Sequence, residues 1–118
     1  MKREQRLRTP ADFRRVHDQS PRVWPHPLLV LRVAPNDLPY SRIGITVSSR
    51  VGKAVVRNRV RRRLHEAARA RLHALAHGYD LLVVARPPSA AASWPELCAA
   101  LDTVLHRAGA TVAVGARV

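Results

Sequence analysis

The residues best suited to chemistry lie between positions 53 and 72, in the segment KAVVRNRVRRRLHEAARARL. Positions 57 to 63 hold five arginines, one asparagine and one valine. If this segment is helical, neighbouring turns repel one another, because each like-charge pair four residues apart costs roughly 0.2–0.5 kcal/mol. A bound polyanion would offset that repulsion, so the segment points to a surface that binds phosphate groups.

The simpler interpretation is a helix face that only contacts solvent. Such faces usually mix charges of both signs, whereas Glu66 is the single acid between positions 50 and 71, against nine lysines and arginines. Gly52 and Lys53 lead into the start of the expected helix, where free N–H groups and the helix dipole also attract phosphate. Asn58 adds a side chain that can both donate and accept hydrogen bonds. Together these features favour an RNA- or DNA-binding surface.

No comparable pattern indicates catalysis by the protein itself. The histidines have no metal-ligand spacing accompanied by cysteine or carboxylate, and His73 and His77 lack a surrounding HExxH pattern. Cys98 falls on an apolar stripe and is expected to be a buried structural thiol. The glycines do not form a phosphate-binding loop. We therefore expect no catalytic residue and no metal ligand.

Composition and charge set the class of protein. With 118 residues, of which 47% are hydrophobic, the chain is long enough for one folded domain over residues 1–118 and too short for two. The formal net charge of +13 indicates a polyanionic partner, either a nucleic acid or an anionic membrane. The membrane is disfavoured because no apolar run approaches the roughly 20 residues that span a bilayer. The basic start, MKREQRLR, precedes no secretory-signal stretch, and a single cysteine suits a reducing compartment, so we expect a cytoplasmic protein.

The start of the chain predicts a flexible segment followed by a helix. Residues 1–8 are polar and basic and are expected to be flexible. Thr9 and Asp12 form a capping box that begins a helix over residues 10–18, with Phe13 on its apolar side.

Three further stretches predict strands. Residues 28–34, LLVLRVA, and residues 79–86, YDLLVVAR, are strongly apolar, and the second suits an interior position in a sheet. Residues 42–48, RIGITVS, alternate large and small side chains and predict a half-buried strand. Residues 19–27 contain three prolines and predict a loop or a short edge strand.

The basic segment predicts the long helix of the domain. It should end near residues 77–78, because glycine is the usual residue just past the last turn of a helix. One stripe is apolar and can dock on a core: Val60, Leu64, Ala67, Ala68 and Leu75. An adjacent face, which points away from that stripe, collects the polar residues Asn58, Arg62, His65 and Arg69.

The last predicted helix begins at a second capping box, formed by Ser93 and Glu96, and ends at Gly109. Its apolar stripe contains Leu97, Cys98, Leu101, Val104 and Leu105. Residues 110–118 are predicted to be a short strand or a loose tail. The resulting order is helix, two or three strands, helix, strand, helix, which indicates an α+β domain.

Three motifs in this order resemble those of the protein subunit of bacterial ribonuclease P. They are LRTPADFRRV, GITVSSRVGKAVVRNRVRRRLHEAAR and GYDLLVVARP, and the resemblance covers about residues 6–108. It implies a single-domain α-β-β-β-α-β-α sandwich, with a central four-stranded mixed sheet and a left-handed β-α-β crossover. General topology rules favour a right-handed crossover, so the handedness comes from the resemblance alone.

The resemblance also implies a division of labour within a ribonucleoprotein. A large RNA subunit would perform the Mg²⁺-dependent hydrolysis that removes the 5′ leader of precursor tRNA, with Mg²⁺ bound mainly by RNA and none held tightly by the protein. The protein would bind that RNA and hold the leader in a cleft between the first helix and the sheet, with no obligate protein partner. One alternative is a structural ribosomal RNA-binding protein. A second, a DNA-binding protein that uses residues 57–71 as a recognition helix, is disfavoured because few side chains there other than arginine could read base edges.

The basic segment and the resemblance together assign residues to two surfaces. The RNA-binding surface contains Arg50, Lys53, Arg57, Asn58, Arg59, Arg61, Arg62, His65 and Arg69. The leader cleft contains Phe13, His17 and Arg32. His17 stands where the family usually has a second aromatic residue, Arg32 where tyrosine is common, and His65 where arginine is usual. The cleft should therefore depend less on stacking and more on charge.

Overall fold

The computed structural model describes residues 3–19 and 22–109. Its helices and strands, in chain order, are α1 (Pro10–Gln19), β1 (Arg22–Pro25), β2 (Leu29–Pro35), β3 (Arg42–Thr46), α2 (Ala54–Arg71), β4 (Tyr79–Ala85) and α3 (Trp94–Arg107). Three short 3₁₀ turns are η1 (Arg3–Gln5), η2 (Leu72–Ala74) and η3 (Pro87–Ala91). The α-β-β-β-α-β-α order is confirmed, and the proline-rich stretch forms the edge strand β1.

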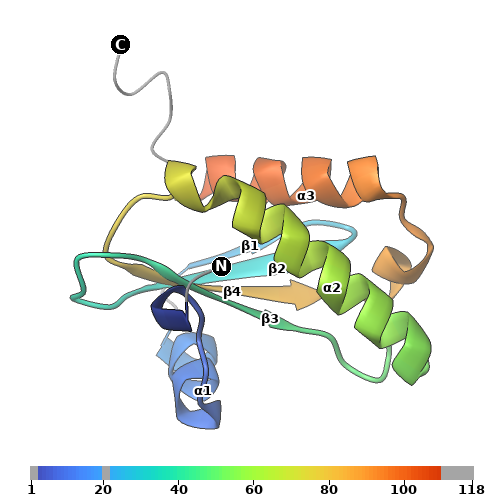
Figure 1. The fold of residues 1–118 in the computed structure, drawn as a ribbon, viewed down its shortest axis with the longest axis horizontal. Helices are drawn as coiled ribbons and strands as arrows, with labels where there is room; N and C mark the ends of the chain where they lie inside the picture. The colour runs from blue at the N-terminus through green and yellow to red at the C-terminus, as the bar shows by residue number, and fades with distance from the viewer. Residues whose placement is uncertain (1–2, 20–21, 110–118) are drawn as a thin grey trace.

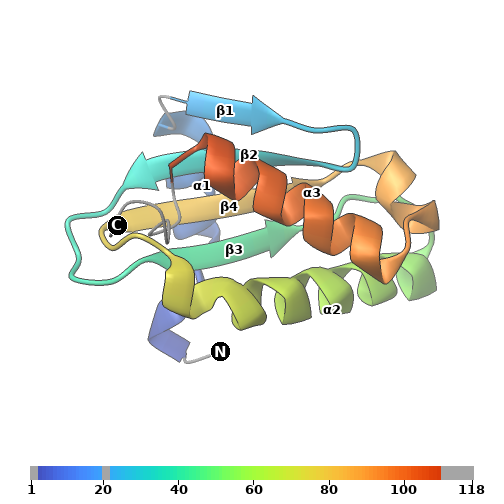
Figure 2. The same ribbon diagram turned by 90° about the horizontal axis from the view of Figure 1, so that it is seen from above.

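The four strands form one mixed sheet in the order β1-β2-β4-β3. Strand β2 pairs antiparallel with both β1 and β4, whereas β3 pairs parallel with β4. Figure 2 looks onto the sheet from the side of α2 and α3, with β3 and β4 both pointing to the right and β4 above β3. A chain that leaves β3, passes through α2 in front of the sheet and enters β4 in this arrangement makes a left-handed crossover, against the general preference.

The sheet carries a core on each face. Figure 1 shows α2 and α3 on one face and α1 on the other. Because side chains alternate along a strand, Leu81 and Val83 of β4 point into the larger core with α2 and α3, while Leu82 packs in the smaller core with Val16 of α1. Strand β4 is therefore buried on both faces, which explains its strongly apolar sequence and its interior position.

Both predicted capping boxes are present. At α1, the Asp12 amide donates to Thr9 Oγ1 at 3.0 Å, and the Thr9 amide donates to Asp12 Oδ2 at 3.5 Å. At α3, the Glu96 amide donates to Ser93 Oγ at 3.2 Å, and the Ser93 amide donates to Glu96 Oε1 at 2.8 Å. Gly109, just past the end of α3, has a φ of 65°, the left-handed conformation that glycine favours there. These local signals in the sequence were therefore sufficient to predict where α1 and α3 begin and where α3 ends.

The apolar stripe of α3 is confirmed with one exception. Four of its residues are buried in the core, namely Leu97, Leu101, Val104 and Leu105. Cys98 is only half-buried, so the prediction of a buried thiol was wrong. It lies at the edge of the stripe, where it still packs against the larger core and also interacts with the Arg71 side chain.

The N-terminal segment, predicted to be flexible over residues 1–8, contacts the sheet at Arg6 and Leu7. Arg6 forms a parallel bridge with Ile43, and the Leu7 amide donates to the Ile43 carbonyl at 3.0 Å. The Leu7 side chain is 5% exposed and belongs to the core beneath α1. A polar and basic composition does not reveal this contact, because one leucine is enough to anchor the segment once α1 and the sheet provide a site for it.

The predicted end of the long helix is also wrong, since α2 ends at Arg71 and not near residue 77. The chain passes through η2 and leaves helical geometry at Leu75, whose side chain is buried in the core. Gly78 has a φ of 90° in the turn that enters β4. The helix stops early because Leu75 reaches the core from an extended backbone. Residues 110–118, predicted to be a short strand or a loose tail, lie outside the described residues.

Candidate nucleic-acid interface

The exposed face of α2 carries the predicted basic surface. The stripe Val60, Leu64, Ala67 and Ala68 is buried against the core. On the opposite side Asn58, Arg62 and Arg69 are exposed and His65 is half-buried. Lys53 is the N-cap residue, makes no capping hydrogen bond with its side chain, and precedes a first turn without an acid. Exposed Arg50 lies just before it, so this helix end attracts anions through charge, dipole and free N–H groups.

Some arginines of α2 are tied to the rest of the fold. Arg59 Nη2 donates to the Ala90 carbonyl at 2.9 Å, and Arg63 Nη1 donates to the Ala92 carbonyl at 3.3 Å. Arg71 pairs with Asp102 of α3. These side chains fasten α2 to η3 and α3. Arg59, assigned to RNA binding from the sequence, therefore has a structural bond as well, although a carbonyl partner leaves its charge unneutralised.

Other arginines of α2 lie free for a second molecule or pair only within the helix. Arg61 Nη1 donates to Asn58 Oδ1 at 2.8 Å, and exposed Arg69 pairs with Glu66, whose pKa it lowers. Within residues 3–19 and 22–109, Arg62 has no hydrogen-bond or ion-pair partner. Arg57 is half-buried, and its Nε is buried without a hydrogen-bond partner. On α2, exposed charge without a partner among the described residues lies at Arg62 and at the Lys53 end of the helix.

His65 lies where the α2 surface meets the N-terminal segment. It borders one hollow with Arg6, Arg8 and Phe13, and a second hollow with Arg6 and Arg69. Burial is the main reason that the pKa of His65 is lowered, and the charges of Arg6 and Arg61 lower it further. Sequence reasoning missed Arg6 and Arg8 as part of this surface because their segment was expected to be flexible. Their positive charge was the one feature of the sequence that could have assigned them to this surface.

A groove runs between α1 and the sheet on the other face of the molecule. It is lined by Phe13, Arg14, His17, Thr46, Leu82 and Val84. Phe13 and His17 are one turn apart on α1, so the structure brings these two predicted cleft residues together. Arg32 lies beside them, and its Nη1 donates to the His17 carbonyl at 3.4 Å. The groove combines one aromatic ring, an apolar floor and basic side chains.

Gly44 of β3 makes room for the wall of this groove. A β-carbon at Gly44 would lie 2.8 Å from Phe13 Cε2 and 2.8 Å from Leu7 Cδ1, closer than such atoms approach in proteins. The missing side chain lets both Phe13 and Leu7 pack against the strand. Sequence reasoning treated this glycine only as a small residue in an alternating strand.

A buried carboxylate holds α1 in place over the groove. Asp80 of β4 is 0% exposed and accepts hydrogen bonds from Arg42 Nε at 2.9 Å, Arg42 Nη2 at 2.7 Å and Asn36 Nδ2 at 2.8 Å. Arg15 of α1 completes the cluster by pairing with the same carboxylate. The hydrogen bonds and charge of Asp80 raise the pKa of Arg42. In the sequence, Asp80 is the one charged residue inside the apolar strand YDLLVVA. Sequence reasoning did not predict this buried cluster from it.

The fold and the two surfaces define a class: a small, basic α+β protein built to contact nucleic acid. The model of the ribonuclease P family matches residues 1–109. The chain belongs to the ribonuclease P protein family.

Close relatives and solved structures agree with this. The ribonuclease P protein component of Roseiflexus castenholzii is 44% identical over 110 residues, covering 92% of this chain and 89% of the relative. That of Herpetosiphon aurantiacus is 42% identical over 108 residues, covering 92% and 87%. The Staphylococcus aureus ribonuclease P protein superposes with a TM-score of 0.82 at 26% identity, covering 90% of this chain and 96% of the other. The Thermotoga maritima ribonuclease P protein superposes with a TM-score of 0.78 at 26% identity, covering 86% of this chain and 96% of the other.

Proposed function

We propose that this chain acts in ribonuclease P by holding two stretches of RNA at once. The exposed face of α2 binds the catalytic RNA subunit, and the groove beside α1 binds the 5′ leader of precursor tRNA. The observation that supports this most directly is the continuity of the two surfaces. His65 and Arg6 border the α2 surface on one side and the Phe13 wall of the groove on the other, so one assembly of RNA can contact both.

Under this proposal the protein binds and positions, and the RNA subunit carries out the phosphodiester hydrolysis. Arginine side chains neutralise phosphates with charge-assisted hydrogen bonds. A leader that is already held in position loses less orientational freedom on reaching the geometry for cleavage. The described residues include no group of three histidine, cysteine, aspartate or glutamate side chains that could hold a metal ion. We assign the Mg²⁺ of the holoenzyme mainly to RNA.

No helix in the described part of the chain is long and apolar enough to cross a membrane. We place the protein in the cytoplasm with its RNA partners and propose no obligate protein partner. The free thiol of Cys98 suits a reducing compartment. The family match favours ribonuclease P over a structural ribosomal protein or a DNA-binding protein as the context for the basic helix.

The test is to capture the full chain from cells and sequence the RNA that copurifies. We expect one abundant non-ribosomal RNA together with precursor tRNAs. That RNA, mixed with the purified chain and Mg²⁺, should release the leader of a precursor tRNA faster than the RNA alone. Enrichment of ribosomal RNA instead would support the ribosomal alternative and contradict the proposal.

A further inference from the structure

Of the residues that the structure describes, none covers the sheet face just past the end of α3. Helix α3 ends at Arg107, and beyond it a pocket of about 230 Å³ opens. It is lined by Arg22 and Trp24 of β1, Val33 and Pro35 of β2, Tyr79 of β4, and Ala108 and Gly109. The strand register places Arg22 opposite Val33 and Pro35 opposite Tyr79, so these side chains share one face of the sheet. It is the face opposite the leader groove, whose floor is Leu82 and Val84.

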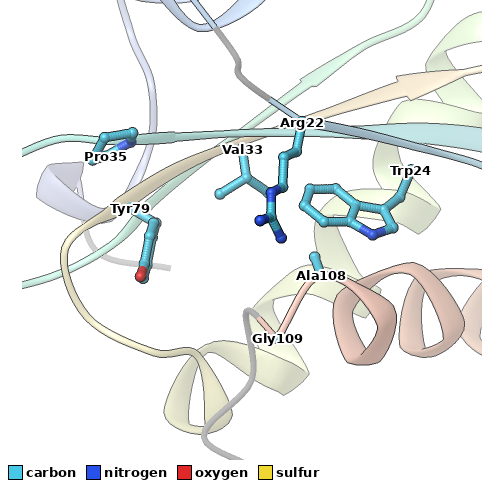
Figure 3. Close-up of a pocket in the computed structure, with 7 residues that line it drawn as sticks. All are labelled: Arg22, Trp24, Val33, Pro35, Tyr79, Ala108 and Gly109. Carbon is cyan, nitrogen blue, oxygen red and sulfur yellow. The ribbon is translucent and has the colours of Figure 1, made fainter.

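The pocket combines aromatic surface with a cation. The chain has two tryptophans, two tyrosines and one phenylalanine. One of the tryptophans, Trp24, and one of the tyrosines, Tyr79, line this pocket. Figure 3 shows the Tyr79 ring on one side and the Arg22 and Trp24 side chains on the other, with Val33 between them. Tyr79 is 38% exposed and Trp24 is half-buried. Among the described residues the exposed Arg22 side chain has no partner.

The chemistry of the lining selects an anionic, aromatic ligand. Among the described residues that line the pocket, Arg22 is the only charged one, so this lining favours an anion. Exposed aromatic faces bind nucleobases by stacking, largely without regard to base identity, and a guanidinium pairs well with phosphate. The volume is below the roughly 300–1,000 Å³ of pockets for drug-sized ligands, which suits a single ring system with its attached group.

We propose that this pocket binds one unpaired nucleotide of RNA, with its base against Tyr79 and Trp24 and its phosphate on Arg22. The inference rests on the proposed RNA-binding function, because the nucleotide belongs to an RNA that the protein already holds. It adds a third contact, on the sheet face away from the leader groove and separate from the exposed face of α2. The pocket would therefore recognise an unpaired nucleotide and not a base-paired RNA helix.

Trp24 itself provides the readout. Replacing Trp94, which is 41% exposed at the start of α3, by phenylalanine leaves Trp24 as the only tryptophan of the full chain. The probe is a 5′-phosphorylated tetra-adenylate RNA titrated into this variant. Stacking should quench Trp24 fluorescence in a saturable way. Arg22→Ala and Tyr79→Leu should each weaken this binding by about fivefold to 100-fold, whereas Tyr79→Phe, which keeps the ring, should bind normally.

Thermal unfolding confirms that each variant is folded before it is compared. Quenching that does not saturate, or that survives both Arg22→Ala and Tyr79→Leu in folded variants, overturns the pocket while the α2 interface stands. The Arg62→Ala variant separates the two proposals, since it should weaken binding of the RNA subunit and leave the Trp24 signal in place. If the chain binds neither the RNA subunit nor the tetranucleotide, the proposed function and this inference fail together.

Discussion

Arginine is used in two different ways in this molecule. Around Asp80, whose side chain is fully buried, Arg15 and Arg42 are bound to a carboxylate and join α1, β3 and β4. On the exposed face of α2, Arg62 has no partner in the described part of the chain. The first cluster is internally satisfied and holds the fold, whereas the second carries charge that only another molecule can neutralise. Burial and partner, more than residue type, separate a structural arginine from a binding one.

The same contrast occurs within one turn of α2. Arg62 is exposed without a partner, while its neighbour Arg63 is half-buried and donates to the Ala92 carbonyl. Successive residues of a helix point about 100° apart, so one of these two side chains faces solvent and the other faces η3. Adjacent arginines in the sequence therefore have different surroundings, and matched substitutions can test whether their functions differ as proposed.

The largest effect is expected at the buried cluster. Asp80→Ala leaves Arg42, Arg15 and Asn36 without their shared acceptor, and breaking a buried ion pair typically costs about 3–5 kcal/mol. Urea unfolding of the free protein measures the loss. The matched control is Asp102→Ala, which removes a carboxylate that is 59% exposed and should cost under about 1 kcal/mol. Equal losses for the two variants would contradict a structural role specific to Asp80.

Arg62 should affect RNA binding and leave stability alone. Losing its charge-assisted contacts with phosphate should cost about 1.5–3 kcal/mol of affinity for the RNA subunit. It should also lower the slope of log affinity against log salt by about one. Stability should change by less than about 0.5 kcal/mol. RNA titrations at several salt concentrations and thermal unfolding measure these quantities.

Arg63→Ala is the matched control for that substitution. It removes a bond to the fold and should lower stability by about 1 kcal/mol, with a smaller effect on RNA affinity than Arg62→Ala has. An Arg62→Ala protein that unfolds easily, yet binds RNA normally in its folded fraction, would show that the exposed face is structural.

Phe13 tests whether the groove beside α1 holds the leader. Phe13→Ala should weaken binding of precursor tRNA by about 1–3 kcal/mol, the usual range for a lost stacking platform, and barely change binding of mature tRNA, which has no leader. Trp94→Ala removes an exposed ring from α3 as a control and should change neither. Equal losses on both tRNAs with Phe13→Ala would mean that the ring serves only to pack against Gly44.

The smallest effect is expected at His65 and depends on pH. In the free protein its pKa is lowered, chiefly by burial and then by Arg6 and Arg61. Bound phosphates favour the protonated form, so the pKa rises in the complex and RNA affinity should increase as the pH falls from about 8 to 6. His65→Ala should flatten this dependence. Affinity that is constant with pH in the unsubstituted protein would contradict the placement of phosphate beside His65.

The free protein should show the opposite response at the same residue. A histidine whose pKa is lower in the folded state binds fewer protons than in the unfolded state. Its contribution to stability is complete above the unfolded pKa of about 6.5 and is lost as the pH falls through the folded value. RNA affinity and protein stability should therefore change in opposite directions on acidification, and both changes should be reduced in His65→Ala.

Several features of this protein followed from the sequence alone. The capping boxes at Thr9 and Ser93, the apolar stripe of α2 from Val60 to Ala68 and the apolar strand β4 were all predicted correctly. The excess of positive charge and its concentration in residues 53–72 also indicated a nucleic-acid partner. These signals are local, because a cap acts within three residues and a stripe repeats within two turns. They can be read without knowing what lies across the fold.

Tertiary structure decided the features that depend on distant partners. Leu7 orders the N-terminal segment only because α1 and Gly44 provide a site for it, and Leu75 ends α2 early because the core lies where an extended chain can reach it. The partners of Arg59 and Arg71 are both 31 residues away in the chain, and the carboxylate that binds Arg15 is 65 residues away. Pairings at such separations are set by how the elements pack, so the composition of the basic helix could predict its charge but not which arginines remain free for RNA.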